Sequence, residues 1–156
     1  ICIWMEKNWY KERITPQKCY MADTGLLVTH TFMDTAFTEN ELYKAILFDK
    51  RDINEGMIME NIVAQMLRRN GHRLYFYSRN DNISRENHMK IDFLIIEKGK
   101  ISPIEVKSGN YRSHSSLDKF RKKFSSKIGT SYILYPKDVM EKDCIWHLPL
   151  YMAMFL

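Results

Sequence analysis

Asp92, Glu105 and Lys107 place two carboxylates and an ammonium group in a part of the sequence that is otherwise largely apolar. Carboxylates that lie close together in apolar surroundings repel one another unless a cation holds them. Hard divalent cations such as Mg²⁺ bind carboxylate oxygens and keep several of their waters. These residue types therefore favour a metal site, provided that the fold brings them together. The alternative is a carboxylate pair at the rim of a sheet, neutralised by Lys107 and by solvent.

Two apolar segments, residues 91–96 and 101–106, would position these side chains. The polar residues between them predict a β-hairpin with a two-residue turn at Lys98-Gly99. Counting back from this turn pairs Asp92 with Glu105, with their Cβ atoms about 5 Å apart. The lysine two residues after Glu105 then shares its face, because alternate residues of a strand point the same way. A shift of one residue would place the two carboxylates on opposite faces.

An amphipathic helix is predicted upstream of the hairpin. Asp52 and Glu55 have the spacing of a capping box, and Gly71 suits the position just after a helix. The apolar side chains at helical spacing are Met59, Ile62, Val63, Met66 and Leu67. Glu60 falls at the edge of this stripe, from which its carboxylate can reach over a sheet edge toward the same metal site. The alternative is a half-exposed glutamate at the helix edge.

The remaining pattern of this part of the chain predicts a mixed α/β domain. Residues 74–78 are rich in aromatic side chains and predict a strand, and residues 131–135 predict another. Residues 115–128 predict a basic helix that ends at Gly129. The order is therefore helix, three strands, helix, strand. His114 precedes the basic helix, and we interpret it as a loop histidine because no partner is expected at ligand spacing nearby.

Residues 1–51 are weakly patterned, and we expect them to form a partly helical extension or linker before a domain that spans residues 52–156. Residues 18–27 would form a short extended segment that turns at residues 23–25. Residues 39–48 would form a short helix. The chain opens Ile-Cys-Ile-Trp without an initiator methionine, so we expect a fragment from the C-terminal part of a longer protein.

The positive charge of the chain is concentrated in one stretch. The formal net charge is +5, but residues 68–127 hold fifteen basic and six acidic side chains, a net charge of +9. A concentrated basic field favours a polyanionic partner, nucleic acid first and an anionic membrane surface second. The residues expected to follow a phosphate backbone are Arg112, Lys119, Arg121, Lys122, Lys123 and Lys127. The alternative is a solvated, lysine-rich face.

The composition also excludes several classes of protein. No run of eighteen apolar residues exists, so no membrane-spanning helix is expected, and the N-terminus lacks the pattern of a secretory signal. The three cysteines are scattered without CxxC spacing, which disfavours a disulfide framework or a thiolate zinc site. A reducing, cytoplasmic compartment is therefore expected. The sequence contains no glycine-rich nucleotide-phosphate loop.

Taken together, these elements and residues resemble the PD-(D/E)XK nuclease-like superfamily. Its restriction-endonuclease-like core has the order αβββαβ, a mixed central sheet flanked by helices, although Ile91 stands where the motif has proline. Several phrases resemble one group more closely, the domain of unknown function 4143: KCYMADTGLL (18–27), MENIVAQML (59–67), KIDFLII (90–96), PIEVKSG (103–109) and SLDKF (116–120). That group lies C-terminal to the AAA-type ATPase module of bacterial and archaeal ATP-binding proteins.

The resemblance implies a role for each candidate residue. Asp92 and Glu105 would bind Mg²⁺ or Mn²⁺, with the Val106 carbonyl as a further ligand. Glu60 would complete the metal shell, directly or through water. Lys107 would orient or deprotonate the attacking water and stabilise the phosphate. The resemblance also implies an upstream ATPase module as a partner, and ATP would act only through that module.

Two functions follow as expectations. The first is metal-dependent phosphodiester hydrolysis on DNA or RNA, which the retained acidic residues and lysine allow. The second is a non-catalytic module with the same fold that holds nucleic acid or regulates the ATPase.

Overall fold

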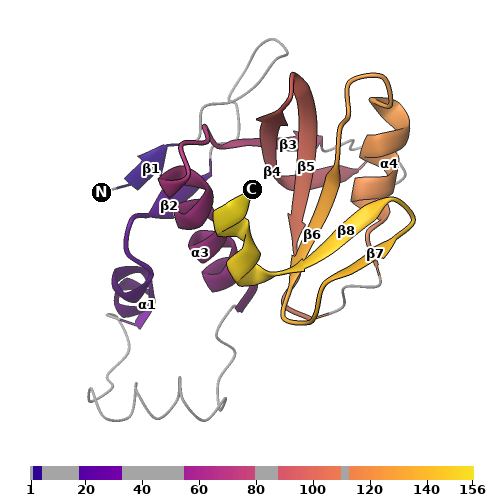
Figure 1. Ribbon diagram of the computed structural model, residues 1–156. Coiled ribbons are helices and arrows are strands. Elements are labelled where there is room, and N and C mark those ends of the chain that lie inside the picture. The colour runs from indigo at the N-terminus through magenta and orange to yellow at the C-terminus, as the bar shows by residue number, and fades with distance from the viewer. Residues whose placement is uncertain (1, 5–17, 33–54, 80–87, 110–112) are drawn as a thin grey trace.

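The described part of the chain is built on a mixed sheet of six strands. The computed structural model describes residues 2–4, 18–32, 55–79, 88–109 and 113–156 (Figure 1). The strands, in their spatial order, are β3 (Tyr75–Arg79), β4 (Met89–Glu97), β5 (Lys100–Val106), β6 (Ser131–Tyr135), β8 (Ile145–Pro149) and β7 (Met140–Lys142). β3, β4 and β5 pair antiparallel, β5, β6 and β8 pair parallel, and β7 is antiparallel to β8. The α/β class with a mixed sheet is therefore confirmed.

Helices cover both faces of this sheet. α3 (Glu55–Arg69) and the 3-10 helix η2 (Leu150–Phe155) lie on one side, and α4 (Ser115–Lys123) lies on the other (Figure 1). Each side has its own buried apolar cluster, and we call the two the α3 side and the α4 side. The α3-side cluster includes Val63, Leu67, Phe93 and Ile104, and the α4-side cluster includes Ile91, Leu117, Phe120 and Ile133. Burial of these two faces holds the layers together.

The buried face of α3 is rotated from the predicted stripe. The buried residues of this helix are Asn61, Val63, Ala64 and Leu67. Met59 and Ile62, which the stripe places inside, are only half-buried. Glu60 precedes Val63 and Leu67 by three and seven positions, so it lies on the buried face and not at its edge. Its side chain is 17% exposed. The carboxylate is thereby directed into the molecule.

α3 ends at a glycine, as predicted. Gly71 takes a φ of 90° and its N–H donates to the Arg68 carbonyl, while the His72 N–H donates to the Leu67 carbonyl, both at 3.1 Å. These two bonds form a Schellman motif, which satisfies the last carbonyls of the helix. The predicted capping residue Asp52 lies outside the described residues.

β4 and β5 form the predicted hairpin in the predicted register. Glu97 pairs with Lys100, and the pairing continues without a shift to Phe93 and Ile104. The two turn residues have φ values of 50° and 76°, which is the combination that a type I′ turn requires. The hairpin therefore carries its residues to the positions that the turn dictates, at least as far as Phe93.

α4 is shorter than predicted and ends at Lys123, not at residue 128. Ile128 instead forms a parallel bridge with Ile101 at the start of β5, and the Gly129 N–H donates to the Ile101 carbonyl at 2.9 Å. A Cβ at Gly129 would lie 3.2 Å from the Lys100 Cβ, so glycine permits this close approach. Pairing with the sheet thus overrides the helical spacing of the apolar residues.

The two strands that follow β6 are not predicted by the sequence pattern. β8 lies parallel beside β6, with Ile145 and Leu148 buried. His147 and Pro149 interrupt the apolar run, so the alternation typical of a strand is missing from the sequence.

None of the helices in the described ranges is both long and apolar enough to cross a membrane.

The N-terminal elements differ in one respect from the prediction. β1 (Cys2–Trp4) and β2 (Cys19–Met21) pair antiparallel, and α1 (Thr24–Phe32) follows. The turn predicted at residues 23–25 is the start of α1, where the Leu26 N–H donates to Asp23 Oδ1 at 2.9 Å. The helix predicted at residues 39–48 lies outside the described residues.

β2 is fixed to α3 by side-chain amides. The Met21 N–H donates to the buried Asn61 Oδ1 at 2.8 Å, and Asn61 Nδ2 donates to Thr24 Oγ1 at 3.0 Å. Gln65 Nε2 donates to the same hydroxyl at 2.8 Å and to the Met21 carbonyl at 3.1 Å. This network satisfies the buried polar groups and sets the direction in which the residues just before Met21 approach the sheet.

Candidate functional site

Asp92 lies where β4 and β5 stop pairing regularly. The last paired residues on this side are Phe93 and Ile104. Beyond them the Val106 N–H donates to Asp92 Oδ2 at 3.1 Å, so a carboxylate oxygen accepts a bond that a strand carbonyl accepts in a regular ladder. Asp92 is 8% exposed. Its carboxylate is therefore buried and oriented by the backbone of β5.

Asp92 lies within a β-bulge of β4. Over the interval from Ile91 to Leu94, β4 has one residue more than its partner strand β3. Ile91 and Leu94 accordingly pack on the α4 side, whereas Phe93 packs on the α3 side. The bulge breaks the strict alternation of faces, and Asp92 contacts groups that come from different parts of the fold.

Glu105 and Lys107 form the first ion pair beside Asp92. Lys107 Nζ lies 2.6 Å from Glu105 Oε1, and Glu105 is 7% exposed. The other oxygen, Oε2, is buried and has no hydrogen-bond partner among the described residues. Burial raises the pKa of the Glu105 carboxyl; the nearby Lys107 lowers it in part, and the Asp92 charge raises it further. One buried carboxylate oxygen is thus left for a cation or a proton.

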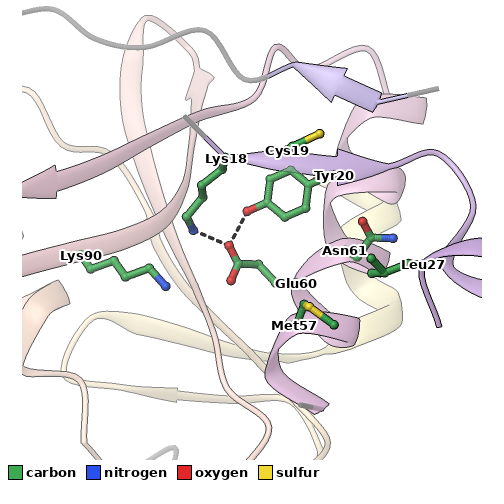
Figure 2. Close-up of a pocket in the computed structure, with 8 residues that line it drawn as sticks. All are labelled: Lys18, Cys19, Tyr20, Leu27, Met57, Glu60, Asn61 and Lys90. Atoms are coloured by element: carbon green, nitrogen blue, oxygen red, sulfur yellow. Dashed lines mark hydrogen bonds and ion pairs between the residues drawn. The ribbon is translucent and has the colours of Figure 1, made fainter. Parts of the chain in front are cut away.

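A second ion pair involves a residue that was not predicted, Lys18. Its ammonium donates to Glu60 Oε1 and, at 3.2 Å, to Asp92 Oδ1. The Tyr20 hydroxyl donates to the same Glu60 oxygen, as Figure 2 shows. Burial, followed by the Glu60 charge, raises the pKa of Tyr20, so the hydroxyl stays protonated as a donor. The sequence signal that could have pointed to Lys18 was its i, i+2 spacing from Tyr20, which places both side chains on one face of an extended segment.

Lysines balance the carboxylates of this region. Lys90 Nζ lies 3.4 Å from Asp92 Oδ1, although its own side chain is half exposed. Among the described residues, the site thus contains three carboxylates and three lysines in two separate sets of ion pairs. Lys18 pairs with Glu60 and Asp92 and Lys90 pairs with Asp92, whereas Lys107 pairs with Glu105 alone. With all six ionised, their formal charges cancel.

The fit of a divalent metal differs among the predicted ligands. No group of three or more His, Cys, Asp and Glu side chains within the described ranges has the arrangement of a metal site. Asp92 and Glu105 offer hard carboxylate oxygens, and the buried Glu105 Oε2 suits a cation. Glu60 Oε1 is already occupied by Lys18 and Tyr20, and both Asp92 oxygens are also in use, because Oδ2 accepts the Val106 N–H and Oδ1 pairs with Lys18 and Lys90. Glu105 is therefore the carboxylate that fits a cation best, and a metal that also binds Asp92 would share it with these groups.

His114 has the acidic partner that the sequence analysis did not assign to it. Its Nδ1 lies 2.9 Å from Asp118 Oδ2, one helical turn along α4. The i, i+4 spacing was visible in the sequence and would have identified this pair. The ring of His114 also lies 6.4 Å from that of His147 on β8. His147 is buried, and this burial lowers the pKa of its imidazole.

The predicted phosphate-contacting residues fall into different surroundings. Arg112 lies outside the described residues. Arg121 donates to the carbonyls of Asp143 (3.1 Å) and Cys144 (3.4 Å), so it holds the turn between β7 and β8. Lys123 lies over the ring of Tyr77, at 5.8 Å from its centroid.

The other lysines of this group lie in and just after α4. Lys122 is exposed and Lys119 half-buried on the helix, and Lys127 is exposed in the turn that follows it. Of the group, Lys122, Lys123 and Lys127 are therefore exposed to solvent, although Lys123 also contacts Tyr77.

A cavity of about 360 Å³ opens beside Glu60. It lies between β2, α1 and the first turns of α3, and Lys18, Tyr20, Glu60 and Lys90 contribute its polar groups (Figure 2). The cavity adjoins the Lys18 side of Asp92. It therefore gives solvent and small solutes access to this half of the site.

Comparison with known proteins gives one result. A search of curated proteins and a search of solved structures each found no match. The model of one protein family matches residues 55–152, a span that includes Glu60, Asp92, Glu105 and Lys107 but not Lys18. This span is more than half of the chain, so the chain belongs to the family described as Domain of unknown function (DUF4143).

Proposed function

We propose that this protein hydrolyses phosphodiester bonds of DNA or RNA with a divalent metal, at a site formed by Asp92, Glu105 and Lys107. The observation that carries this proposal is the buried Glu105 carboxylate, whose Oε2 is unpartnered in the described part of the chain. A buried, unpaired oxygen is costly, and a cation would remove that cost. The order α3, β3, β4, β5, α4, β6 supports the proposal, because it corresponds to the αβββαβ core of the PD-(D/E)XK superfamily.

Each residue has a role that its surroundings support. Asp92 and Glu105 would hold Mg²⁺ or Mn²⁺, which when bound supplies a water of lowered pKa and offsets charge at phosphorus. Lys107, 2.6 Å from Glu105 Oε1, would stabilise the negative charge of the phosphate and orient the attacking water. The Val106 N–H fixes Asp92, whereas a role for the Val106 carbonyl as a ligand stays a prediction.

The partners follow from charge and from the family resemblance. The exposed lysines in and after α4, Lys122, Lys123 and Lys127, would contact the phosphate backbone through a salt-dependent attraction. We further propose that an AAA-type ATPase module acts beside this domain in the cytoplasm and accounts for any requirement for ATP.

A second candidate function is a non-catalytic module that binds nucleic acid or regulates the ATPase. The observation that favours it is the ion pairing of Lys18 with both Glu60 and Asp92. This pairing supplies positive charge where a catalytic metal would otherwise supply it. A domain with this arrangement can keep its fold without metal.

Incubation with plasmid, single-stranded DNA and RNA separates the two functions. Each substrate is tested with Mg²⁺, with Mn²⁺ and with EDTA, using wild-type protein and the variants Asp92→Asn and Lys107→Met. Lys142→Met, on the exposed strand β7, removes the same charge far from the site and is the matched control. Cleavage that needs metal, is lost in both site variants and persists in the control supports hydrolysis.

Two other results would decide against hydrolysis at this site. Cleavage that is unchanged in Asp92→Asn and Lys107→Met would come from another site or from a contaminant. Salt-sensitive binding without cleavage under any metal condition would favour the non-catalytic module.

A further inference from the structure

Lys18 enters the site from a separate part of the chain. It lies directly before β2, and β2 is held on α3 by the hydrogen bond from the Met21 N–H to Asn61 Oδ1. The backbone therefore delivers the lysine side chain to one place between Glu60 and Asp92. Its side chain is 18% exposed, so the contact is largely enclosed.

Two aromatic rings and two carboxylates surround the Lys18 ammonium. It lies 5.6 Å from the ring centroid of Phe76 and 5.9 Å from that of Phe93, within the range of cation–π attraction. It also pairs with two carboxylates that would otherwise repel each other. Enclosed pairs of this kind are screened by salt much less than exposed pairs.

The oxygens of Asp92 are already in use. Oδ2 accepts the Val106 N–H, and Oδ1 lies 3.2 Å from Lys18 Nζ and 3.4 Å from Lys90 Nζ. Lys90 is half exposed and can turn into solvent, whereas Lys18 is enclosed. A divalent ion that binds Asp92 must therefore come close to the Lys18 ammonium, and the two cations repel each other.

We propose that Lys18 is an internal cation of the site that competes with a divalent metal for Asp92. This inference rests on the proposed function, because it concerns the same metal. Glu60 then acts as a positioning residue: it holds Lys18, with the Tyr20 hydroxyl on the same oxygen, and does not bind metal itself. Removing the charge of Lys18 leaves the site with a net negative charge and strengthens metal binding.

The test is a calorimetric titration with Mn²⁺ in the absence of nucleic acid. The proteins are wild type, Lys18→Met, Lys18→Gln, Lys18→Arg, Asp92→Asn and the distant control Lys142→Met. Lys18→Met and Lys18→Gln should bind Mn²⁺ about tenfold more tightly than wild type. Lys18→Arg keeps the charge and should bind no more tightly than wild type, and Lys142→Met should stay within about twofold. Thermal melting by circular dichroism identifies the folded variants, and Lys18→Gln keeps polar contacts if Lys18→Met does not fold.

The outcomes separate the inference from the proposed function. If wild type binds Mn²⁺ through Asp92 but folded Lys18→Met or Lys18→Gln binds equally or less tightly, the inference is wrong and the metal site stands. If no variant binds Mn²⁺, or if Asp92→Asn binds as well as wild type, both are wrong. Tighter binding by Lys18→Arg as well would show that size, not charge, is responsible, and would also overturn the inference.

Discussion

The two ion pairs beside Asp92 are assembled in opposite ways. Glu105 lies on β5 and Lys107 directly after its end, so the two residues of this pair are only two positions apart in the chain. Lys18 and Glu60 are 42 residues apart and meet only when β2 is docked on α3. The pair proposed to act on the substrate is therefore local, whereas the pair that neutralises Asp92 from the other side depends on tertiary structure.

The two pairs also differ in how they tolerate a loss of charge. Burial has already raised the pKa of Glu105, so this carboxyl can take up a proton if its lysine is lost. Glu60 and Asp92 share Lys18, so the loss of that one ammonium affects two carboxylates at once. The pair of Lys18 and Glu60, which we call the remote pair, should consequently be the more sensitive of the two to the loss of its lysine.

The largest expected effect concerns Phe93, which supports the remote pair. It is fully buried, its ring lies 5.5 Å from that of Tyr20, and the Lys18 ammonium lies over it. Phe93→Ala should lower the free energy of unfolding by about 3–5 kcal/mol, measured by urea denaturation. Ile96→Ala, at a position 65% exposed on the same strand, should change it by less than about 0.5 kcal/mol. Equal effects of the two would show that β4 is not buried as described.

The next effect compares the two lysines directly. Lys18→Met should lower the free energy of unfolding by about 2 kcal/mol at neutral pH, because two enclosed carboxylates lose a partner. Lys107→Met should lower it by about half as much, because only Glu105 is affected and it can be protonated. Urea denaturation of both variants at the same pH measures the difference. The comparison between the two pairs fails if Lys107→Met is the more destabilised variant.

A smaller effect depends on pH and belongs to the α4 side. His147 lies in register with Glu105 through Ile133, and burial lowers the pKa of its imidazole. The unfolded chain therefore binds this proton more readily, so stability is full above the ordinary histidine pKa of about 6.5 and falls as the pH drops below it. In His147→Gln this part of the loss should disappear, measured by urea denaturation at several pH values.

His88→Gln, at an exposed position, is the control for the pH series. An unchanged slope in His147→Gln, or an equal change in His88→Gln, would contradict the assignment of the pH dependence to His147.

The smallest expected effect tests a local contact of α4. Lys123 lies 5.8 Å from the ring centroid of Tyr77 and 5.2 Å from that of Phe124. Lys123→Met should lower the free energy of unfolding by about 0.5 kcal/mol, whereas Lys122→Met on the exposed face should have no measurable effect. High-precision thermal melts of both variants measure it. A greater loss in Lys122→Met would mean that the outer face of α4 is not solvent-exposed.

The part of the site that the sequence predicts is the local part, and the part that it misses depends on contacts between distant residues. The register of the hairpin was predictable as far as Phe93 and Ile104 because a two-residue turn fixes the pairs that follow it, but the regular pairing ends before the predicted pair of Asp92 and Glu105. Lys18 was not, because its partners are 42 and 74 residues away and no local pattern records that distance. The end of α4 was missed for a similar reason: Ile128 fits the helical spacing but pairs with β5.

Two other differences have separate causes, one local and one not. The pairing of His114 with Asp118 is an i, i+4 relation that the sequence displays, so a closer reading of helix spacing would have found it. The rotation of α3 that buries Glu60 comes from the buried Asn61, whose amide binds the backbone of β2. Burial of a polar residue of this kind depends on its partner and is not visible in an apolar stripe.

The hydrogen bond from the Val106 N–H to Asp92 makes this amide a natural spectroscopic reporter. Its nitrogen and proton resonances depend on the charge of the acceptor, so they should shift when Asp92 takes up a proton or binds a cation. The neighbouring Lys107 N–H, which donates to the Leu134 carbonyl at 2.8 Å, provides an internal reference. Isotope-labelled protein could thus follow the occupancy of Asp92 in solution without a chemical probe or a substrate.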